Sequence, residues 1–212
     1  MNAEMPIEPV RTKAVWGPRI ALAGAVLLSL VLSSCSEAIR TGQSPVYLIL
    51  TSLQGAKGGG ANANSFSSSL ASDVVTLVPA VTGTQTYFAD LGQATLQLQV
   101  KDQGGTAPTP ANAITLTQYH VKYMRTDGRN VQGVDVPYEF DGGLGVTVFG
   151  TATVSFTLVR TQAKLEAPLK ALANNLEVIS TIAEVTFYGH DQNGREISVS
   201  GRIDVSFANY PD

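Results

Sequence analysis

The feature that most limits the fold is a pair of alternating segments near the C-terminus, joined by a turn. Residues 181–188 (TIAEVTFY) and 197–207 (ISVSGRIDVSF) alternate apolar and polar side chains, with Asn193-Gly194 between them. A period of two is typical of a strand with one buried and one wet face, and Asn-Gly tolerates the positive φ angles of a tight turn. The pattern predicts a β-hairpin. Gly201, inside its second strand, predicts a bulge or a close approach by another segment.

Similar segments recur every 10–20 residues along the preceding chain. Residues 94–100 (ATLQLQV) alternate cleanly, with Leu96, Leu98 and Val100 on one face. The other predicted strands are 46–53, 74–78, 114–125, 146–148 and 151–160, with a short edge strand at 134–140 that contains Pro137. Turn residues such as Asp127-Gly128 and Asp141-Gly142-Gly143 separate them. Only residues 164–172 predict a short helix, so the pattern indicates an all-β antiparallel sandwich or barrel.

The string Tyr119-x-Val121-x-Tyr123, the seven to nine strands and the terminal hairpin resemble an immunoglobulin or fibronectin type III sandwich. The resemblance covers residues 94–207 and implies an antiparallel β-sandwich. The chain departs from the immunoglobulin pattern because it has no cysteine pair and its one tryptophan is Trp16. We expect a single domain at 46–212, with a flexible Gly/Ser-rich loop at 54–69.

The N-terminal segment has the three parts of an export signal. Arg11, Lys13 and Arg19 precede an apolar run at 20–32, which is shorter than the roughly 20 residues that a membrane-spanning helix needs. The run ends in Leu32-Ser33-Ser34-Cys35, which resembles the lipobox of bacterial lipoproteins. That resemblance implies that the Cys35 thiol takes a diacylglycerol, that residues 1–34 are removed, and that residues 35–45 are a tether. An ordinary cleaved signal peptide and a single-span anchor are the alternatives.

A lipid on Cys35 would fix where the protein works. Two or three acyl chains give stable anchoring, whereas one chain gives only marginal binding. Ser36, rather than Asp, follows the cysteine. In the lipoprotein family this implies the outer membrane where the source has two membranes. We therefore expect attachment to a membrane of the cell envelope through the N-terminal lipid.

Charge and cysteine content exclude several classes of protein. The whole chain carries a net charge of −3, and residues 1–34 hold three positive and two negative side chains, so the remainder carries about −4. A weakly acidic chain without a run of Lys and Arg is not expected to bind nucleic acid. Cys35 is the one cysteine, so an internal disulfide and a cysteine zinc site are both impossible.

Catalytic and metal-binding motifs are weak. No GxSxG string occurs, and the two histidines, His120 and His190, are expected on solvated surfaces. Zinc bound by both histidines and Asp191 would need them close together. Calcium is a further alternative, because Asp191, Asn193 and Glu196 share one turn and Asp127 and Asn130 another; Arg195 and Arg202 occupy positions where an EF-hand loop needs ligands. We expect no catalytic residue, no metal and no cofactor.

The remaining candidates are carboxylates and aromatic side chains. Asp135, Glu139 and Asp141 could cluster as in a glycosidase, although acids beside Gly and Pro are usually solvated. Tyr138, Phe140 and Tyr87 are candidate ligand-binding aromatics. The leading hypothesis is a lipid-anchored, non-enzymatic envelope protein with a structural role or a protein partner. A carbohydrate- or small-ligand-binding module that uses these aromatics is the alternative, and a hydrolase with an unrecognised site is a third.

Overall fold

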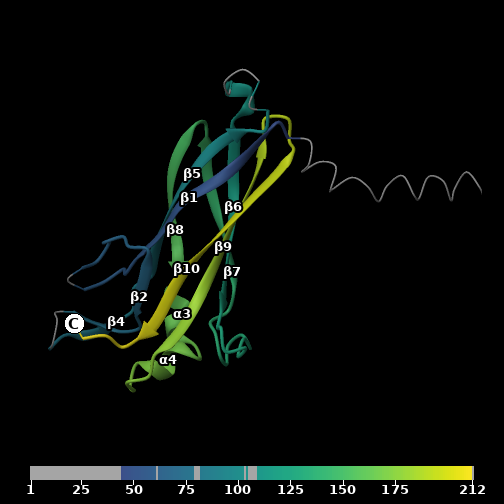
Figure 1. Ribbon diagram of the computed structural model, residues 1–212. Helices are drawn as coiled ribbons and strands as arrows, with labels where there is room; N and C mark the ends of the chain where they lie inside the picture. Colours follow the sequence, from purple (N-terminus) through teal and green to yellow (C-terminus); the bar gives the residue numbers. More distant parts are fainter. Residues whose placement is uncertain (1–43, 61, 79–81, 103, 105–108, 212) are drawn as a thin grey trace, which may run out of the picture. The chain divides into compact units, whose positions relative to one another are not determined.

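The computed structural model describes residues 44–60, 62–78, 82–102, 104 and 109–211 (Figure 1). The predicted signal segment 1–34, Cys35 and most of the predicted tether lie outside the described residues. The chain divides into two units, Met1–Ile39 and Arg40–Asp212, and the description below concerns the second.

The all-β prediction is confirmed: nearly all regular structure in the described residues is strand. One sheet has the order β1 (Val46–Ala56), β5 (Asp90–Val100), β8 (Thr151–Val159), all antiparallel. The other has the order β2 (Ser69–Asp73), β10 (Glu196–Ala208), β9 (Ile179–Asp191), β6 (Ile114–Met124), β7 (Phe140–Val148). It is mixed, because β2 pairs with β10 in parallel. A small ribbon, β3 (Thr76–Val78) with β4 (Thr84–Thr86), and a short turn of helix, η1 (Pro110–Asn112), complete the strand-rich part.

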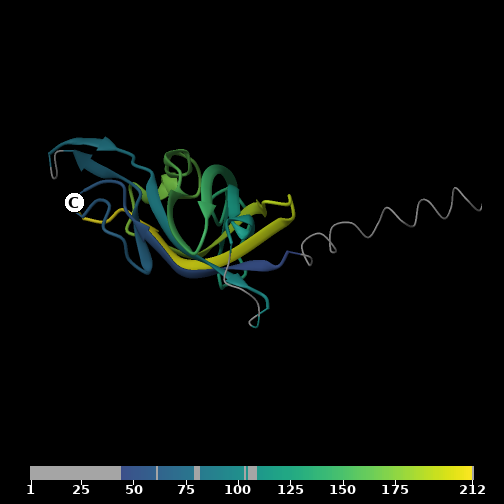
Figure 2. The same cartoon turned by 90° about the horizontal axis from the view of Figure 1, so that it is seen from above.

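The predicted C-terminal hairpin is confirmed. Strands β9 and β10 pair antiparallel without a register shift, and Gly194 in the connecting turn has φ of 74°. Gly201 marks a close approach rather than a bulge, because a Cβ there would lie 2.1 Å from Leu50 Cδ2. Strands β1 and β10 thus come together although they belong to different sheets. In Figure 2 they run along one side of the domain, in blue and yellow.

The two sheets share one core, built by the alternating apolar faces. Phe156 on β8 packs edge-on against Phe187 on β9, with ring centroids 5.3 Å apart. Tyr119 and Tyr123 on β6 also reach across to β8: Thr157 N–H donates to the Tyr119 hydroxyl at 3.2 Å, and the Tyr123 hydroxyl donates to the Leu158 carbonyl at 2.5 Å. Burial raises the pKa of Tyr123 well above its ordinary value. The sheets are therefore joined by polar bonds inside an apolar core.

The prediction for residues 134–143 is wrong. Residues 134–139 form no strand apart from an isolated bridge between Gln132 and Val136, and the predicted turn at 141–143 lies inside β7. For the segment predicted as a turn, the reason is a close packing contact. A Cβ on Gly142 would lie 2.2 Å from the Tyr119 ring, so this glycine makes room for an aromatic side chain on the neighbouring strand. Asp141-Gly142-Gly143 resembles a turn in sequence, but in the structure it lies within a strand and Gly142 makes room for packing.

Other boundaries differ from the prediction in smaller ways. Strand β1 continues to Ala56, into the segment predicted as loop 54–69, and the segment predicted as one strand at 74–78 contributes only β3. Strand β2 was missed because SLASD has too few apolar residues to signal a strand. The predicted helix at 164–172 is instead two short helices, α3 (Thr161–Leu165) and α4 (Leu169–Leu172), with Pro168 directly before the second.

Candidate functional site

The three aromatic residues expected to bind a ligand do not form one exposed platform. Phe140 is buried, with the Arg160 guanidinium 4.4 Å from the centre of its ring and Tyr119 edge-on to it. Tyr87 is half-buried against the core. Only Tyr138 is exposed. The expectation for Phe140 therefore needs correction: it was predicted to end an exposed edge strand at 134–140, whereas it is the first residue of β7 and its side chain points inward.

The histidines make local contacts. His120 lies on the outer face of β6, with Nδ1 2.9 Å from an Asp141 carboxylate oxygen and Nε2 3.7 Å from Glu139. Asp135, predicted to cluster with these two acids, instead accepts the Val131 N–H at 3.1 Å. His190 Nδ1 lies 3.1 Å from the Asp191 carbonyl oxygen. The two acids beside His120 are well exposed, and nothing in this arrangement excludes water from the histidine.

Asp191, the central residue of the calcium alternative, is buried, and its carboxylate accepts hydrogen bonds from other groups of the protein. Its carboxylate accepts the Asn193 and Arg195 N–H groups, both at 2.9 Å, and the Ser44 hydroxyl at 3.2 Å. These bonds shape the hairpin turn and fasten the start of the described domain to it. Within the described ranges, no three His, Cys, Asp or Glu side chains gather in a way that could hold a metal ion.

The sequence did not predict a buried cluster of charged side chains. The Lys164 ammonium on α3 lies 2.9 Å from the Asp90 carboxylate and donates to the Asp73 carbonyl at 2.7 Å. Asp90 also accepts the Ser72 hydroxyl at 2.5 Å and the Gly58 N–H at 3.0 Å. Burial raises the pKa of Asp90, and the charge of Lys164 opposes that shift. The cluster ties four distant segments together, and its donors and acceptors satisfy one another, so its evident role is structural.

A pocket lies between the β6–β7 loop and the segment from Ala167 to the start of β9. It has a volume of about 670 Å³, within the range of known ligand sites. We call it the distal pocket. Its lining is mixed: Arg125, Arg129, Asp135 and Glu177 supply charge, and Val134, Pro168, Leu172 and Val178 supply apolar surface.

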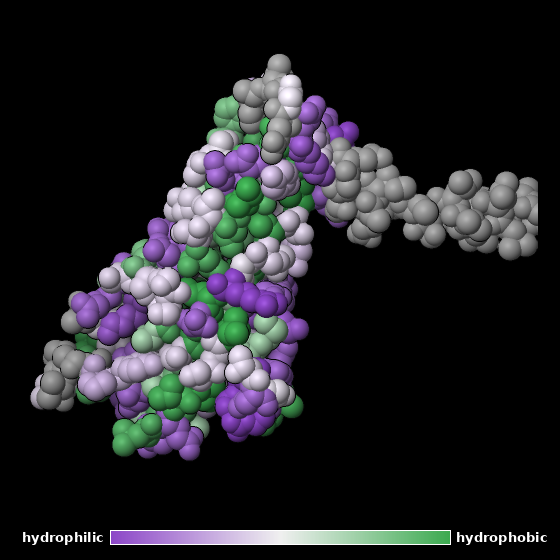
Figure 3. Space-filling view, in the orientation of Figure 1, coloured by the Kyte–Doolittle hydropathy of each residue, from purple (hydrophilic) through white to green (hydrophobic). Residues whose placement is uncertain are grey.

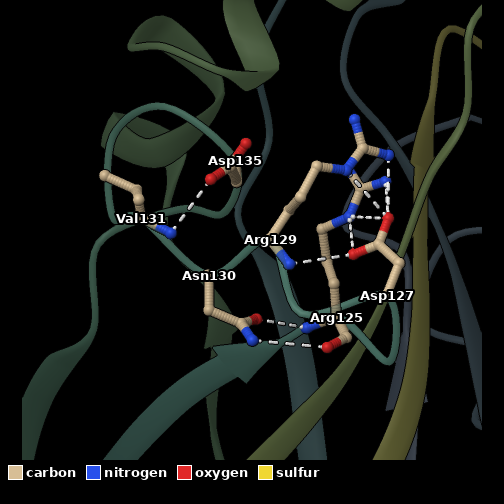
Figure 4. Close-up of polar contacts among 6 residues, drawn as sticks. All are labelled: Arg125, Asp127, Arg129, Asn130, Val131 and Asp135. Atoms are coloured by element: carbon tan, nitrogen blue, oxygen red, sulfur yellow. Dashed lines mark hydrogen bonds and ion pairs between the residues drawn. The ribbon is translucent and has the colours of Figure 1, made fainter.

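One wall of the distal pocket is a loop fixed by its own side chains (Figure 4). The Asp127 carboxylate forms ion pairs with Arg125 Nη2 and Arg129 Nη2, each at 2.8 Å. These two arginines hold the pKa of the Asp127 carboxyl well below its ordinary range. Asn130 Oδ1 accepts the Arg125 N–H at 2.6 Å, which closes the loop at the end of β6. The arginines are therefore fixed in position and their charge is partly neutralised.

Exposed apolar side chains surround the distal pocket. Val134 is 66% exposed, Val178 54% and Leu176 98%. Figure 3 shows apolar surface at this lower end of the domain, in the region of α4, beside a strongly hydrophilic cluster. Arginine is enriched at protein interfaces, and exposed apolar groups gathered in one place mark interaction sites. The arrangement can dock a partner, and it contains no paired nucleophile and base.

Comparison with known proteins gives no family. The chain matches no protein-family model and no curated protein sequence. In the described part of the chain, no helix is long and apolar enough to cross a membrane.

Proposed function

We propose that this protein is a lipid-anchored, non-enzymatic protein of the cell envelope, whose β domain binds a protein partner at the distal pocket. Cys35 would carry the lipid, because it follows the apolar run in the lipobox-like string Leu32-Ser33-Ser34-Cys35. In a source with two membranes, Ser36 favours the outer membrane. For the fold, we infer a sandwich of the immunoglobulin or fibronectin type III kind, supported by two facing sheets over one core.

The observation that carries the docking proposal is the position of the distal pocket relative to the start of the domain. Ser44 bonds to Asp191 at the β9–β10 turn, and Ile114 at the start of β6 pairs with Asp191 too. Strand β6 has 11 residues and ends at Met124, next to Arg125 of the pocket. At about 3.4 Å per residue the two ends are roughly 35 Å apart. A domain tethered at the Ser44 end keeps the pocket end free for a partner.

The anchor is tested by metabolic labelling with an alkyne analogue of palmitate. The wild-type chain should incorporate the label and Cys35→Ser should not. Labelling of Cys35→Ser at the wild-type level would contradict the anchor.

Docking is tested separately with a photo-reactive amino acid placed at Val178, beside the pocket, or at Ser198 on the exposed face of β10. A discrete covalent adduct from position 178 and none from position 198 is the expected result in intact cells. Equal adducts from both positions, or none from position 178, would contradict docking at the pocket while leaving the labelling result unaffected.

A further inference from the structure

The buried Lys164–Asp90 pair brings together two groups that can react with each other. Lys164 Nζ lies 2.9 Å from Asp90 Oδ1, the two side chains are 1% and 0% exposed, and the residues are 74 positions apart. Asp90 Cγ, the carbon that an amine attacks, is one bond beyond Oδ1. Holding two reacting groups in contact gives effective molarities of about 10⁵–10⁸ M in well-oriented cases. The fold therefore places an amine against a carboxyl group in a position to condense with it.

Burial favours the uncharged form of this pair, which is the reactive form. An amine attacks through its free electron pair, so the ammonium must first lose a proton and the carboxylate must gain one. Burial raises the pKa of Asp90, and the charge of Lys164 opposes that shift. Passage of the ammonium proton to Oδ1, along the 2.9 Å hydrogen bond, removes both charges at once. Because charges are costly in an interior without water, burial makes the neutral amine and acid accessible together.

The groups around the pair orient both reactants. The Ser72 hydroxyl donates to Asp90 Oδ2 at 2.5 Å, and the Gly58 N–H donates to Oδ1 at 3.0 Å. Attack on Cγ places negative charge on Oδ2, and a donor already in place stabilises such an oxyanion. The Asp73 carbonyl accepts a second hydrogen bond from Lys164 Nζ at 2.7 Å and so fixes the amine. Ser72 is thus an oxyanion donor, and the two backbone groups hold the reacting atoms in contact.

We propose that Lys164 and Asp90 become joined by an intramolecular isopeptide bond. The bond from Nζ to Cγ forms and the bond from Cγ to Oδ1 breaks. Oδ1 takes two protons from the former ammonium and leaves as water, while Oδ2 stays as the amide carbonyl and keeps its bond to Ser72. The reaction needs no oxidant and no second protein. It cross-links α3 to the start of β5 in a chain whose one cysteine, Cys35, allows no internal disulfide. The proposal does not depend on the lipid anchor or on the distal pocket.

The test is peptide mapping by mass spectrometry of the full chain, purified in detergent, denatured and digested with trypsin. Without the bond, trypsin cleaves after Lys164, and residues 58–101 and 161–164 appear as separate peptides. With the bond, residues 58–101 and 161–170 appear as one branched peptide, which is lighter than the two together by one water molecule. The wild-type chain should give the branched peptide. Lys164→Arg keeps the positive charge but has no nucleophilic amine, so it should give none.

Lys170 is the internal control, because it is exposed and lies in the same branched peptide. Fragmentation should place the bond at Lys164 and leave Lys170 free. Ser72→Ala should slow linkage after a labelling pulse about a hundredfold, as expected for loss of one oxyanion donor, and circular dichroism checks that this variant folds. Three results would overturn the proposal. The wild-type chain gives only separate peptides, in which case the two side chains remain an ion pair; or the bond lies at Lys170; or Ser72→Ala links at the wild-type rate.

Discussion

Two regions of the interior hold the same pair of sheets together by different means. At the centre, Phe156, Phe187 and Tyr119 interlock across the sheets, and only the tyrosine contributes a polar bond. At the start of β5, a fully buried Lys164–Asp90 ion pair connects α3 to one sheet, and Ser72 and the Asp73 carbonyl of β2, in the other sheet, bond to the same two side chains. The apolar contacts tolerate small shifts, because dispersion and burial are not directional. The buried ion pair depends on geometry, because an unpaired charge in the interior is costly.

The largest expected effect comes from breaking the ion pair. Lys164→Met should cost about 3–5 kcal/mol of unfolding free energy, because it leaves the Asp90 carboxylate buried without its partner. Chemical denaturation followed by circular dichroism measures the loss.

The double variant Asp90→Asn with Lys164→Met provides the control. It removes both charges and keeps an oxygen for the Gly58 N–H, so it should recover a large part of the stability. If the double variant is as unstable as Lys164→Met, the unpaired charge is not the cause.

Next in size is a cavity at the apolar centre. Leu96 is fully buried on the inner face of β5, and Leu96→Ala should cost about 2–5 kcal/mol. A second, polar substitution should not restore the stability of Leu96→Ala, whereas Asp90→Asn should restore much of the stability of Lys164→Met. A loss below about 1 kcal/mol would mean that the core collapses around the space. The same denaturation assay gives the value.

These two regions also show what sequence can predict here. The inward residues of the central strands, such as Leu96, Leu98 and Val121, follow from a period of two, which only a bulge in β6 between Leu116 and Gln118 interrupts in these two strands. Asp90 and Lys164 are 74 positions apart, and each resembles an ordinary solvated charge in sequence. Strand β2 was missed for a related reason, since it depends on pairing with β10 rather than on its own pattern.

The candidate sites were less predictable than the fold. That Ile49, Gln97 and Thr151 lie side by side depends on the register of three strands, which alternation alone does not fix. The Arg125–Asp127–Arg129 arrangement has a partial signal in sequence, because Asp127-Gly128 predicts a turn there. The contact of both arginines with one carboxylate could not be predicted, because it depends on the backbone conformation of the loop.

An intermediate effect tests the polar bond between the sheets. Tyr123→Phe removes the hydroxyl that bonds to the Leu158 carbonyl and keeps the ring against Phe207. The loss should be about 1–2 kcal/mol, because the buried carbonyl loses its side-chain partner. The expected order is thus Lys164→Met, Leu96→Ala, Tyr123→Phe. A Tyr123→Phe variant as stable as wild type would show that packing alone joins the sheets at this point.

The smallest effect should come from the exposed ion pairs of the distal pocket, which contrast with the buried pair. Asp127 is bound by Arg125 and Arg129, and its pKa is lowered in the folded protein. A lowered carboxyl pKa stabilises the fold at pH values above the ordinary aspartate pKa of about 4, and this contribution is lost as pH falls through the folded-state pKa.

Asp127→Asn should therefore be slightly less stable than wild type at pH 7, and the difference should shrink as pH falls well below 4. It should also shrink at high salt, because solvent and ions screen exposed pairs. Thermal unfolding of both proteins across pH and salt measures this; a penalty unaffected by either would mean that Asp127 acts through the loop backbone, where it accepts the Arg129 N–H, rather than through its charge.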